Sequence, residues 1–315
     1  MKFFLSKINP KFVAFILLLV NFIFFNSSVL AFPIYAQQAY ATPREANGRI
    51  ACANCHLAQK PVEIEVPQAV LPNSVFEAVV KIPYDLNSKQ ILASGTKGGL
   101  NVGAVVILPD YFKLASPSQL SKEVKEKNKG VYISPYRSKL ENILVVGPIS
   151  GNQHQEISFP IVAPNPELNK EVNFLKYPIY VGANRGRGQI NPTGEKTNNN
   201  TFLASVTGKV ESITFDASGN YEINVKNSEG LSVTQSIPKY YELNIIKGQL
   251  VTIDQPITKE PNVGGFGQTE TEIVLQSANR IYGYIAICFV IILTQIFLVI
   301  KKKQFEKVQA SELNF

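Results

Sequence analysis

An uncharged apolar segment near the C-terminus, Ile281–Ile300, most constrains what this chain can fold into. At about 1.5 Å per residue, a helix over this segment spans a bilayer core of roughly 30 Å. Arg280 precedes it and Lys301–Lys303 follow it, so the positive-inside rule keeps residues 301–315 on the side of synthesis. We therefore predict one transmembrane helix at 281–300, with the chain before it exported. A buried core helix is the alternative, which the flanking cations disfavour.

The N-terminus carries the pattern of a secretory signal. A basic stretch precedes the apolar run Phe12–Phe25, and the small-residue site Val29-Leu30-Ala31 follows. We predict cleavage after Ala31, which removes residues 1–31 and leaves Phe32 at the mature N-terminus. A retained anchor is the alternative, but the apolar run is short for a span. Roughly 250 residues remain between the two apolar segments, enough for one large domain or two unequal ones.

The formal net charge of +7 is moderate, and part of it lies in the signal and the tail. This distribution does not indicate a nucleic-acid-binding protein. A smaller basic surface that meets an acidic protein partner is the better interpretation.

Three cysteines occur, and Cys288 lies inside the predicted span. The other two, Cys52 and Cys55, stand in Cys-Ala-Asn-Cys-His, the C-x-x-C-H pattern of c-type haem attachment. This spacing lets both thiols bond one porphyrin edge, and His56 then points at the iron as an axial ligand. A redox dithiol would follow a βαβ pattern and a zinc site would need two further ligands; neither uses His56. We predict one covalently bound haem c.

The second axial ligand is less strongly indicated. The single methionine is Met1, which leaves with the signal, and the remaining histidine, His154, stands in a polar stretch typical of a solvated loop. The α-amine of Phe32 has an unperturbed pKa of about 7.7 to 8.0, so it is easier to deprotonate than a lysine near 10.4. From the residues alone we rank the Phe32 amine narrowly ahead of His154 and lysine.

Helical signals in the exported part concentrate between Phe32 and Leu57. They comprise a capping box with proline at its first helical position, Thr42–Glu45, and a short helix that carries the haem motif. Beyond them, β-rich runs predict an antiparallel sandwich and, after the polar cluster 193–201, a small second β domain. The glycine-rich stretch 262–268 predicts a turn into the last strand. The predicted strands are 62–66, 75–82, 102–108, 143–146, 156–162, 177–181, 209–215, 221–225, 232–237, 243–246, 250–253 and 271–275.

Three segments near the predicted mature N-terminus, Phe32–Gln38, Pro43–Ile50 and Cys52–Ala58, closely resemble the cytochrome f family. Further matches are 66–72, 184–189, 264–268 and 301–308, so the resemblance covers essentially the whole mature chain. It implies a mainly β fold with an elongated two-domain lumenal part and one C-terminal transmembrane helix. A large antiparallel β-sandwich, 32–199 plus 262–280, would carry the haem, and 200–261 would form the small β domain.

The resemblance implies a subunit of the cytochrome b6f complex of oxygenic photosynthesis, beside cytochrome b6 and the other subunits. Such a subunit takes one electron from the Rieske iron-sulfur protein and passes it to plastocyanin or cytochrome c6. Its haem domain lies in the thylakoid lumen and its C-terminus in the stroma or cytoplasm. The composition leans towards a plastid host, with a cyanobacterium as the alternative.

The resemblance also implies an electron carrier and not an enzyme. A peroxidase or reductase would need an open sixth position and a distal acid or base, for which His154 is the one candidate. A cytochrome of the c1 type normally uses methionine as its sixth ligand, and the mature chain has none.

Site residues follow from the resemblance as well. It assigns the sixth ligand to the Phe32 amine, in agreement with the ranking above, and places Pro192 beside the haem. Buried amides suit a chain of internal waters, since each water needs two to four polar partners. The family positions that hold such a chain near the haem fall on Gln90, Asn184, Gln189, Asn199 and Asn262.

The family's basic docking patch is only partly present. Lys89 and Lys97 match it, but Thr96 replaces a lysine, and 216–220 lacks the lysines of some relatives. We expect docking to be less strongly steered by charge, because such charges act mainly on the association rate.

Overall fold

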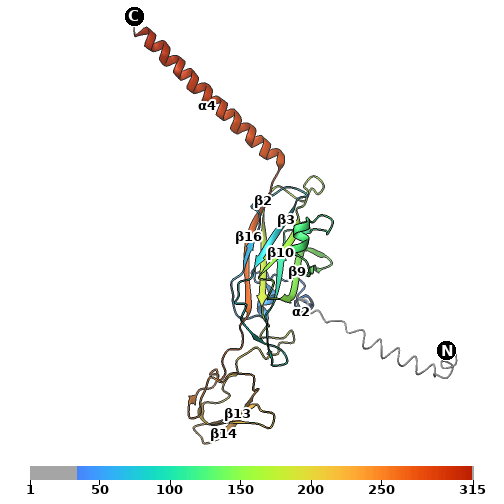
Figure 1. Ribbon diagram of the computed structural model, residues 1–315, viewed down its shortest axis with the longest axis vertical. Coiled ribbons are helices and arrows are strands. Elements are labelled where there is room, and N and C mark those ends of the chain that lie inside the picture. The colour runs from blue at the N-terminus through green and yellow to red at the C-terminus, as the bar shows by residue number, and fades with distance from the viewer. Residues whose placement is uncertain (1–33, 314–315) are drawn as a thin grey trace, which may run out of the picture. The chain divides into compact units, whose positions relative to one another are not determined.

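The computed structural model describes residues 34–313, so the predicted signal peptide and Phe32 lie outside the described residues. As predicted, the described chain is mainly β and ends in one long apolar helix (Figure 1). Most β-rich runs of the sequence form strands, and 156–162 and 232–237 do so with the predicted bounds.

Two sheets face each other across the main core. The six-stranded sheet has the order β2 (Ala69–Val70), β16 (Gly265–Leu275), β11 (Lys176–Arg185), β6 (Asn101–Ile107), β9 (Leu140–Ser150), β8 (Ile133–Arg137). The four-stranded sheet has the order β1 (Glu63–Glu65), β3 (Val75–Lys81), β10 (Glu156–Val162), β7 (Lys113–Leu114). Their pairings are antiparallel apart from β2 with β16, which is parallel.

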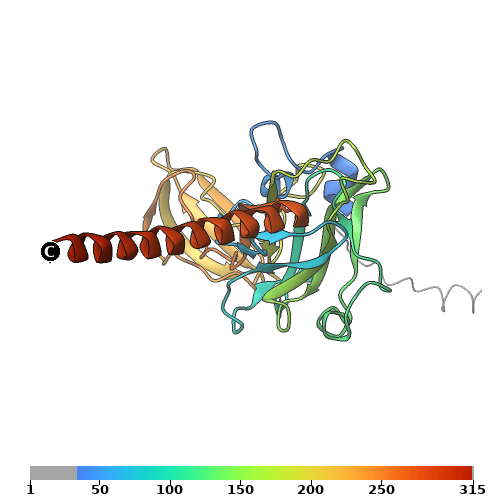
Figure 2. The ribbon, with the colours of Figure 1, turned by 90° about the horizontal axis from the view of Figure 1, so that it is seen from above.

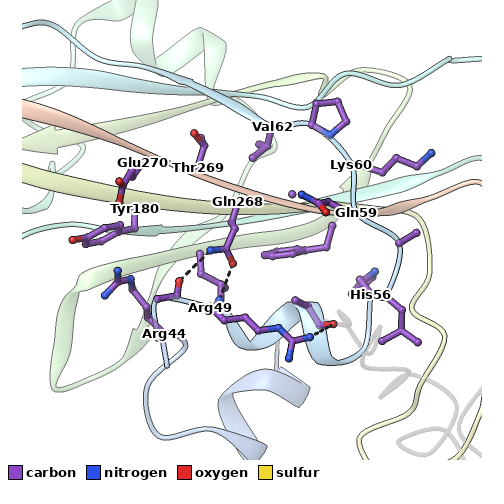
Figure 3. A pocket seen from close by; sticks show the side chains of 18 of the residues that line it. Arg44, Arg49, His56, Gln59, Lys60, Val62, Tyr180, Gln268, Thr269 and Glu270 are labelled. Atoms are coloured by element: carbon purple, nitrogen blue, oxygen red, sulfur yellow. Dashed lines mark hydrogen bonds between the residues drawn. The ribbon is translucent and has the colours of Figure 1, made fainter. Parts of the chain in front are cut away.

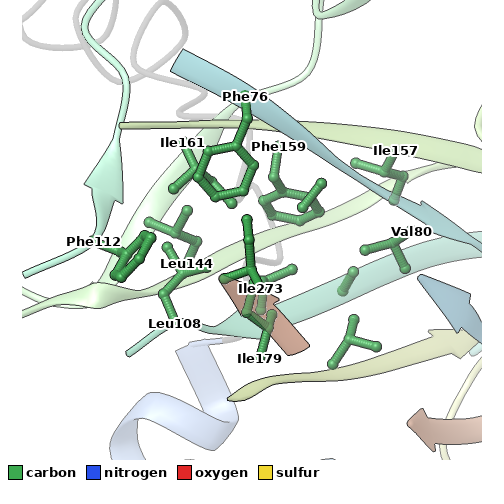
Figure 4. Packing of buried hydrophobic residues seen from close by; sticks show 14 of the residues in the cluster. Phe76, Val80, Leu108, Phe112, Leu144, Ile157, Phe159, Ile161, Ile179 and Ile273 are labelled. Atoms are coloured by element: carbon green, nitrogen blue, oxygen red, sulfur yellow. The ribbon is translucent and has the colours of Figure 1, made fainter. Parts of the chain in front are cut away.

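Alternating side chains of both sheets form this core (Figure 4). In β3 every second residue is buried, and Val80 is opposite Ile157 of β10. Both belong to the same cluster as Ile179 and Ile273 of the other sheet. Period-two burial of this kind is what a strand with one face on a core requires. Each such side chain stabilises the fold by about 1.5–3 kcal/mol relative to exposure.

A second core belongs to another four-stranded sheet, with the order β14 (Ser232–Ile237), β13 (Tyr221–Lys226), β12 (Gly208–Phe215), β15 (Leu250–Val251). Val210, Ile223 and Ile237 are fully buried in it. Ile91, from the hairpin of β4 (Gln90–Ile91) and β5 (Lys97–Gly98), belongs to the same cluster. The domain boundaries given above stay predictions.

The C-terminal helix α4 runs from Ala278 to Glu312, with Ser277 accepting a hydrogen bond from the Arg280 amide at its start. It contains the whole predicted span, is long and apolar enough to cross a membrane, and none of its side chains is buried. Figure 2 shows it as one unbroken helix. The helix continues beyond the span, so most of the predicted tail is helical too.

The structure corrects several local predictions. Thr42–Glu45 does not start a helix: Arg44 forms a β-bridge with Ile50, and its guanidinium lies 3.8 Å from the centre of the Tyr180 ring. The predicted short helix at the haem motif is present as the 3₁₀ helix η1 (Ala51–Asn54). Before α4 the described chain also contains α2 (Ile34–Ala39) and α3 (Lys122–Lys127), of which α3 was not predicted.

Two strand predictions also need correction. The run 243–246 forms no strand, only a bridge from Leu243 to Thr258. The predicted glycine-rich turn at 262–268 is shorter than expected: 262–264 are irregular, whereas 265–268 already form the first part of β16. Glycine is needed there for close approach, because a β-carbon on Gly267 would lie 2.1 Å from the Lys60 carbonyl oxygen.

Phe159→Ala should lower the free energy of unfolding by about 3–5 kcal/mol, because the ring is fully buried and its removal leaves a cavity. The control, Phe215→Ala, removes a ring that is 66% exposed and should cost below about 1 kcal/mol. Chemical denaturation of the detergent-solubilised chain, followed by circular dichroism, measures both. Equal losses would contradict the assigned core.

Candidate functional site

The C-x-x-C-H motif folds as a single tight turn. Cys52 lies in η1, and its carbonyl oxygen accepts hydrogen bonds from the amides of Cys55 (3.2 Å) and His56 (3.0 Å). Neither cysteine forms a disulfide. The turn therefore brings two thiols and one imidazole together within five consecutive residues.

Burial decides the protonation of these groups. It raises the pKa of the Cys52 thiol to about 11, raises that of Cys55, and lowers the pKa of His56 to about 4. At neutral pH the imidazole is uncharged, the form that ligates a metal. Its Nδ1 atom is buried and has no hydrogen-bond partner in the described part of the chain. Two thiols beside a neutral imidazole fit the donor set of a covalently bound haem.

A cavity of about 1060 Å³ borders the motif (Figure 3). His56 and Ala53 line it together with the cationic side chains of Arg44, Arg49 and Lys60. Neither cysteine lines it. Because covalent attachment needs both thiols, this cavity alone does not define where a haem would lie.

Strand β16 holds the attachment segment from one side. The Gln268 side chain accepts a hydrogen bond from the Ile50 amide (2.9 Å) and donates one to the Gly48 carbonyl oxygen (3.0 Å), as Figure 3 shows. The Phe266 amide donates to the Ala58 carbonyl oxygen (2.8 Å), and the Lys60 amide donates back to that of Phe266 (2.8 Å). Hydrogen bonds to β16 thus hold the backbone both before and after the motif turn.

The loop after β11 holds the segment from another side. The Gln189 amide donates to the Cys55 carbonyl oxygen (2.8 Å), and the Gln189 side chain accepts from the Leu57 amide (2.9 Å). A β-carbon on Gly188 would lie 3.0 Å from the Cys55 carbonyl oxygen, so the backbones approach closely there. One predicted site residue, Gln189, is therefore in direct contact with the motif.

Three more predicted residues gather around the backbone of Arg187. Gln90 accepts a hydrogen bond from its amide (2.8 Å), and Asn199 donates to its carbonyl oxygen (2.9 Å) and to Asn262 (3.2 Å). Asn199 Oδ1 is buried without a partner among the described residues, the kind of acceptor that an internal water satisfies. We call Gln90, Gln189, Asn199 and Asn262 the amide cluster. Its role in a water chain stays a prediction.

Other predicted residues lie outside this cluster. Asn184 is half-buried on β11, Pro192 is exposed in a turn, and His154 lies in the turn between β9 and β10, its Nδ1 2.8 Å from the Ser150 carbonyl oxygen. Lys89 and Lys97 are exposed at the β4–β5 hairpin, and Lys97 forms an ion pair with Glu242 at 3.2 Å. Phe32 is outside the described residues.

Two family models match the chain: apocytochrome F, N-terminal, over residues 32–186, and apocytochrome F, C-terminal, over residues 198–315. The chain belongs to the cytochrome f family. It is 64% identical to cytochrome f of Porphyra purpurea over 285 residues, which cover 90% of this chain and 89% of that protein. Identity to cytochrome f of Cyanophora paradoxa is 60% (96% and 94% covered), and to that of Chlorokybus atmophyticus 56% (99% and 99% covered).

A contact that sequence reasoning missed fixes α2 to β8. The Tyr136 hydroxyl of β8 lies within hydrogen-bond distance of two carbonyl oxygens, those of Ala36 (2.6 Å) and Tyr40 (2.9 Å), and its one proton is donated to either or shared between them. The Arg137 guanidinium donates to the Gln37 carbonyl oxygen (2.5 Å). The Gln37 side chain in turn donates to the Tyr136 carbonyl oxygen (2.7 Å). The partners are about a hundred residues apart, so no local pattern could indicate them. Tyr136 and Cys52 belong to the same hydrophobic cluster, which links α2 to the haem motif.

Tyr136→Phe should destabilise the fold by about 0.5–1.5 kcal/mol, because it removes the hydroxyl that joins β8 to the carbonyl oxygens of Ala36 and Tyr40. Both oxygens keep a second donor, the Tyr40 amide and the Arg137 guanidinium. Amide hydrogen exchange at residues 36–40 should speed up with it. Tyr35→Phe, which changes an exposed hydroxyl on the same helix, is the control and should leave both measurements unchanged. Unchanged exchange in the Tyr136 variant would show that the hydroxyl does not hold the helix.

Proposed function

We propose that this chain is the c-type cytochrome subunit of a cytochrome b6f complex and carries one haem c on Cys52, Cys55 and His56. The observation that supports this most directly is the motif turn, which brings two thiols together with a half-buried, neutral imidazole in a chain of the cytochrome f family. When bound, haem supplies a one-electron redox couple. The role is electron transfer, with no bond of a substrate made or broken.

In this proposal the protein fixes the positions of the residues that bind the haem. His56 would offer a ring nitrogen to the iron, and we propose the Phe32 α-amine as the second protein ligand. Support for the latter comes from α2, which begins two residues after Phe32 and is fixed to β8 by Tyr136 and Arg137. The backbone on both sides of His56 is held by Gln189 and Phe266, so it would move little when the iron changes charge, which favours fast outer-sphere transfer.

Electrons would arrive from the Rieske iron-sulfur protein and leave to plastocyanin or cytochrome c6. Cytochrome b6 and the other subunits would surround α4 in the thylakoid membrane. The uncharged span followed by Lys301–Lys303 supports an orientation with the haem-carrying part in the lumen and the C-terminus in the stroma, or in the cytoplasm of a cyanobacterium. Within the protein, the amide cluster and Asn184 would hold a chain of waters, with Pro192 packing beside the haem.

Replacement of the motif cysteines tests the haem assignment. Cys52→Ala together with Cys55→Ala should abolish covalent haem, because no thioether bond can form. The control, Cys288→Ser in α4, should keep it. Haem staining of denaturing gels and the mass of the mature chain measure the outcome. A native chain without covalent haem, or haem retained in the double variant, would refute the assignment.

The ion pairs around Lys97 sharpen the docking proposal for Lys89 and Lys97. Glu242 pairs with both Lys97 and Lys259 at 3.2 Å, and these lysines hold the pKa of its carboxyl below its usual range. Glu242 is therefore charged at neutral pH and offsets part of the positive field of this surface. A partly neutralised surface steers an acidic partner less strongly.

The rate of electron transfer to the native acceptor should accordingly fall only slightly as ionic strength rises. Glu242→Gln should raise the rate at low salt and steepen its salt dependence, because it frees two cations. Glu272→Gln makes the same charge change beside Lys176 on the six-stranded sheet and serves as the control. Stopped-flow kinetics over a salt series measure all three chains. A steep fall of the native chain's electron-transfer rate with rising ionic strength would contradict the proposal of weak electrostatic steering.

A further inference from the structure

Arg185 is a buried cation that the proposed function does not use. It ends β11, its side chain is 1% exposed, and it is among the largest fully buried side chains of the described chain. By the alternation of the strand it shares a face with Val181 and Ala183, which belong to the main core. A charged group therefore closes one end of an apolar interior.

The guanidinium is poorly compensated. One of its Nη atoms donates to the Pro61 carbonyl oxygen, whereas Nε and the other Nη are buried without partners among residues 34–313. None of the ion pairs of the described chain joins a carboxylate to it. Burial lowers its pKa to about 10, so it still carries a full charge at neutral pH. Tyr84, the titratable group that acts on it, has a pKa raised by burial and is neutral there.

Burying such an unpaired charge costs folding free energy. Removing an ion from water without an opposite charge is strongly unfavourable, and an apolar side chain of similar volume usually fills such a place at less cost. Packing alone therefore does not account for an arginine here, which points to a use for its charge.

The charge lies against the segment that carries the haem ligand. Pro61, which accepts its hydrogen bond, follows His56 by five residues. In the sheet Arg185 pairs with Gly265, where a β-carbon would lie 2.4 Å from the Ala58 carbonyl oxygen. The stretch after His56 thus runs along the start of β16, with Gln59 bridged to Phe266, and its end at Pro61 meets the guanidinium. Charges in such a buried place are weakly screened.

We propose that Arg185 raises the reduction potential of the haem iron by holding an uncompensated positive charge beside the His56–Pro61 segment. The inference rests on the proposed attachment of haem to this motif. Oxidised iron carries one more positive charge than reduced iron, so a fixed cation nearby disfavours the oxidised form. Net charge and burial near a redox centre are established determinants of its potential.

Redox titration of the haem-loaded full chain in detergent, against a reference couple, tests this. Arg185→Gln removes the charge while its amide can still donate to the Pro61 carbonyl oxygen, and Arg185→Met replaces the volume alone. In either folded variant the equilibrium constant for reduction should fall roughly tenfold, which is 59 mV for one electron. Arg185→Lys should retain most of the native value, because it keeps the charge.

Lys176→Gln is the matched control, because it removes a cation from an exposed position at the other end of the same strand. It should leave the potential unchanged. The absorption and magnetic-resonance signatures of the axial ligands should be the same in all variants, which separates an electrostatic effect from a displaced ligand.

An unchanged potential in folded Arg185→Gln or Arg185→Met would overturn the inference. An equal fall in Arg185→Lys would do so as well, since it would trace the effect to structure and not to charge. If the native chain carries covalent haem and the variants give either of these results, the proposed function still stands. A native chain without haem overturns both.

Discussion

The antiparallel pairing of β16 with β11 is the interaction on which the other features depend. It runs without a break from Lys176 opposite Val274 to Arg185 opposite Gly265. One face of β16 sends Ile273 into the main core, while the other face presents the side chain that holds the haem motif, Gln268. The same strand ends three residues before α4 begins. A shift of the β16–β11 pairing by one residue would exchange the two faces of β16. The packing of the core, the position of the haem segment and the start of the membrane helix therefore all depend on this one pairing register.

Where the chain leaves β11, buried backbone groups lose their strand partners. The amide and carbonyl of Arg187 lie in that irregular stretch, and Gln90 and Asn199 supply the missing acceptor and donor. Buried peptide groups are nearly always paired, and a primary amide can both donate and accept. This explains why side chains that would be exposed in an ordinary loop are buried here. It also leaves Asn199 Oδ1 with unused capacity next to the motif loop.

Local patterns in the sequence predicted what depends on local chemistry. The alternation of apolar residues located most strands, and the motif located two thiols and an imidazole on one short turn. The capping box at Thr42–Glu45 misled, because the contacts of Arg44 with Ile50 and the Tyr180 ring hold the segment in a bridge. Tertiary contacts overrode a weak helical preference. The link between Tyr136 and α2 could not be predicted, since it joins residues about a hundred positions apart.

The positive charges of this chain divide by their environment, which the sequence alone does not show. Lys97 is exposed, paired with Glu242 and surrounded by solvent, so its field fades beyond about 10 Å in ordinary salt. Arg185 has no carboxylate partner in the described chain, and the core around it screens it poorly. A solvent-facing charge acts mainly on how fast a partner arrives, whereas a buried one acts on the energy of whatever charge changes beside it. Two cations that look alike in a sequence therefore bear on different steps of electron transfer, and strand register decides which role each takes.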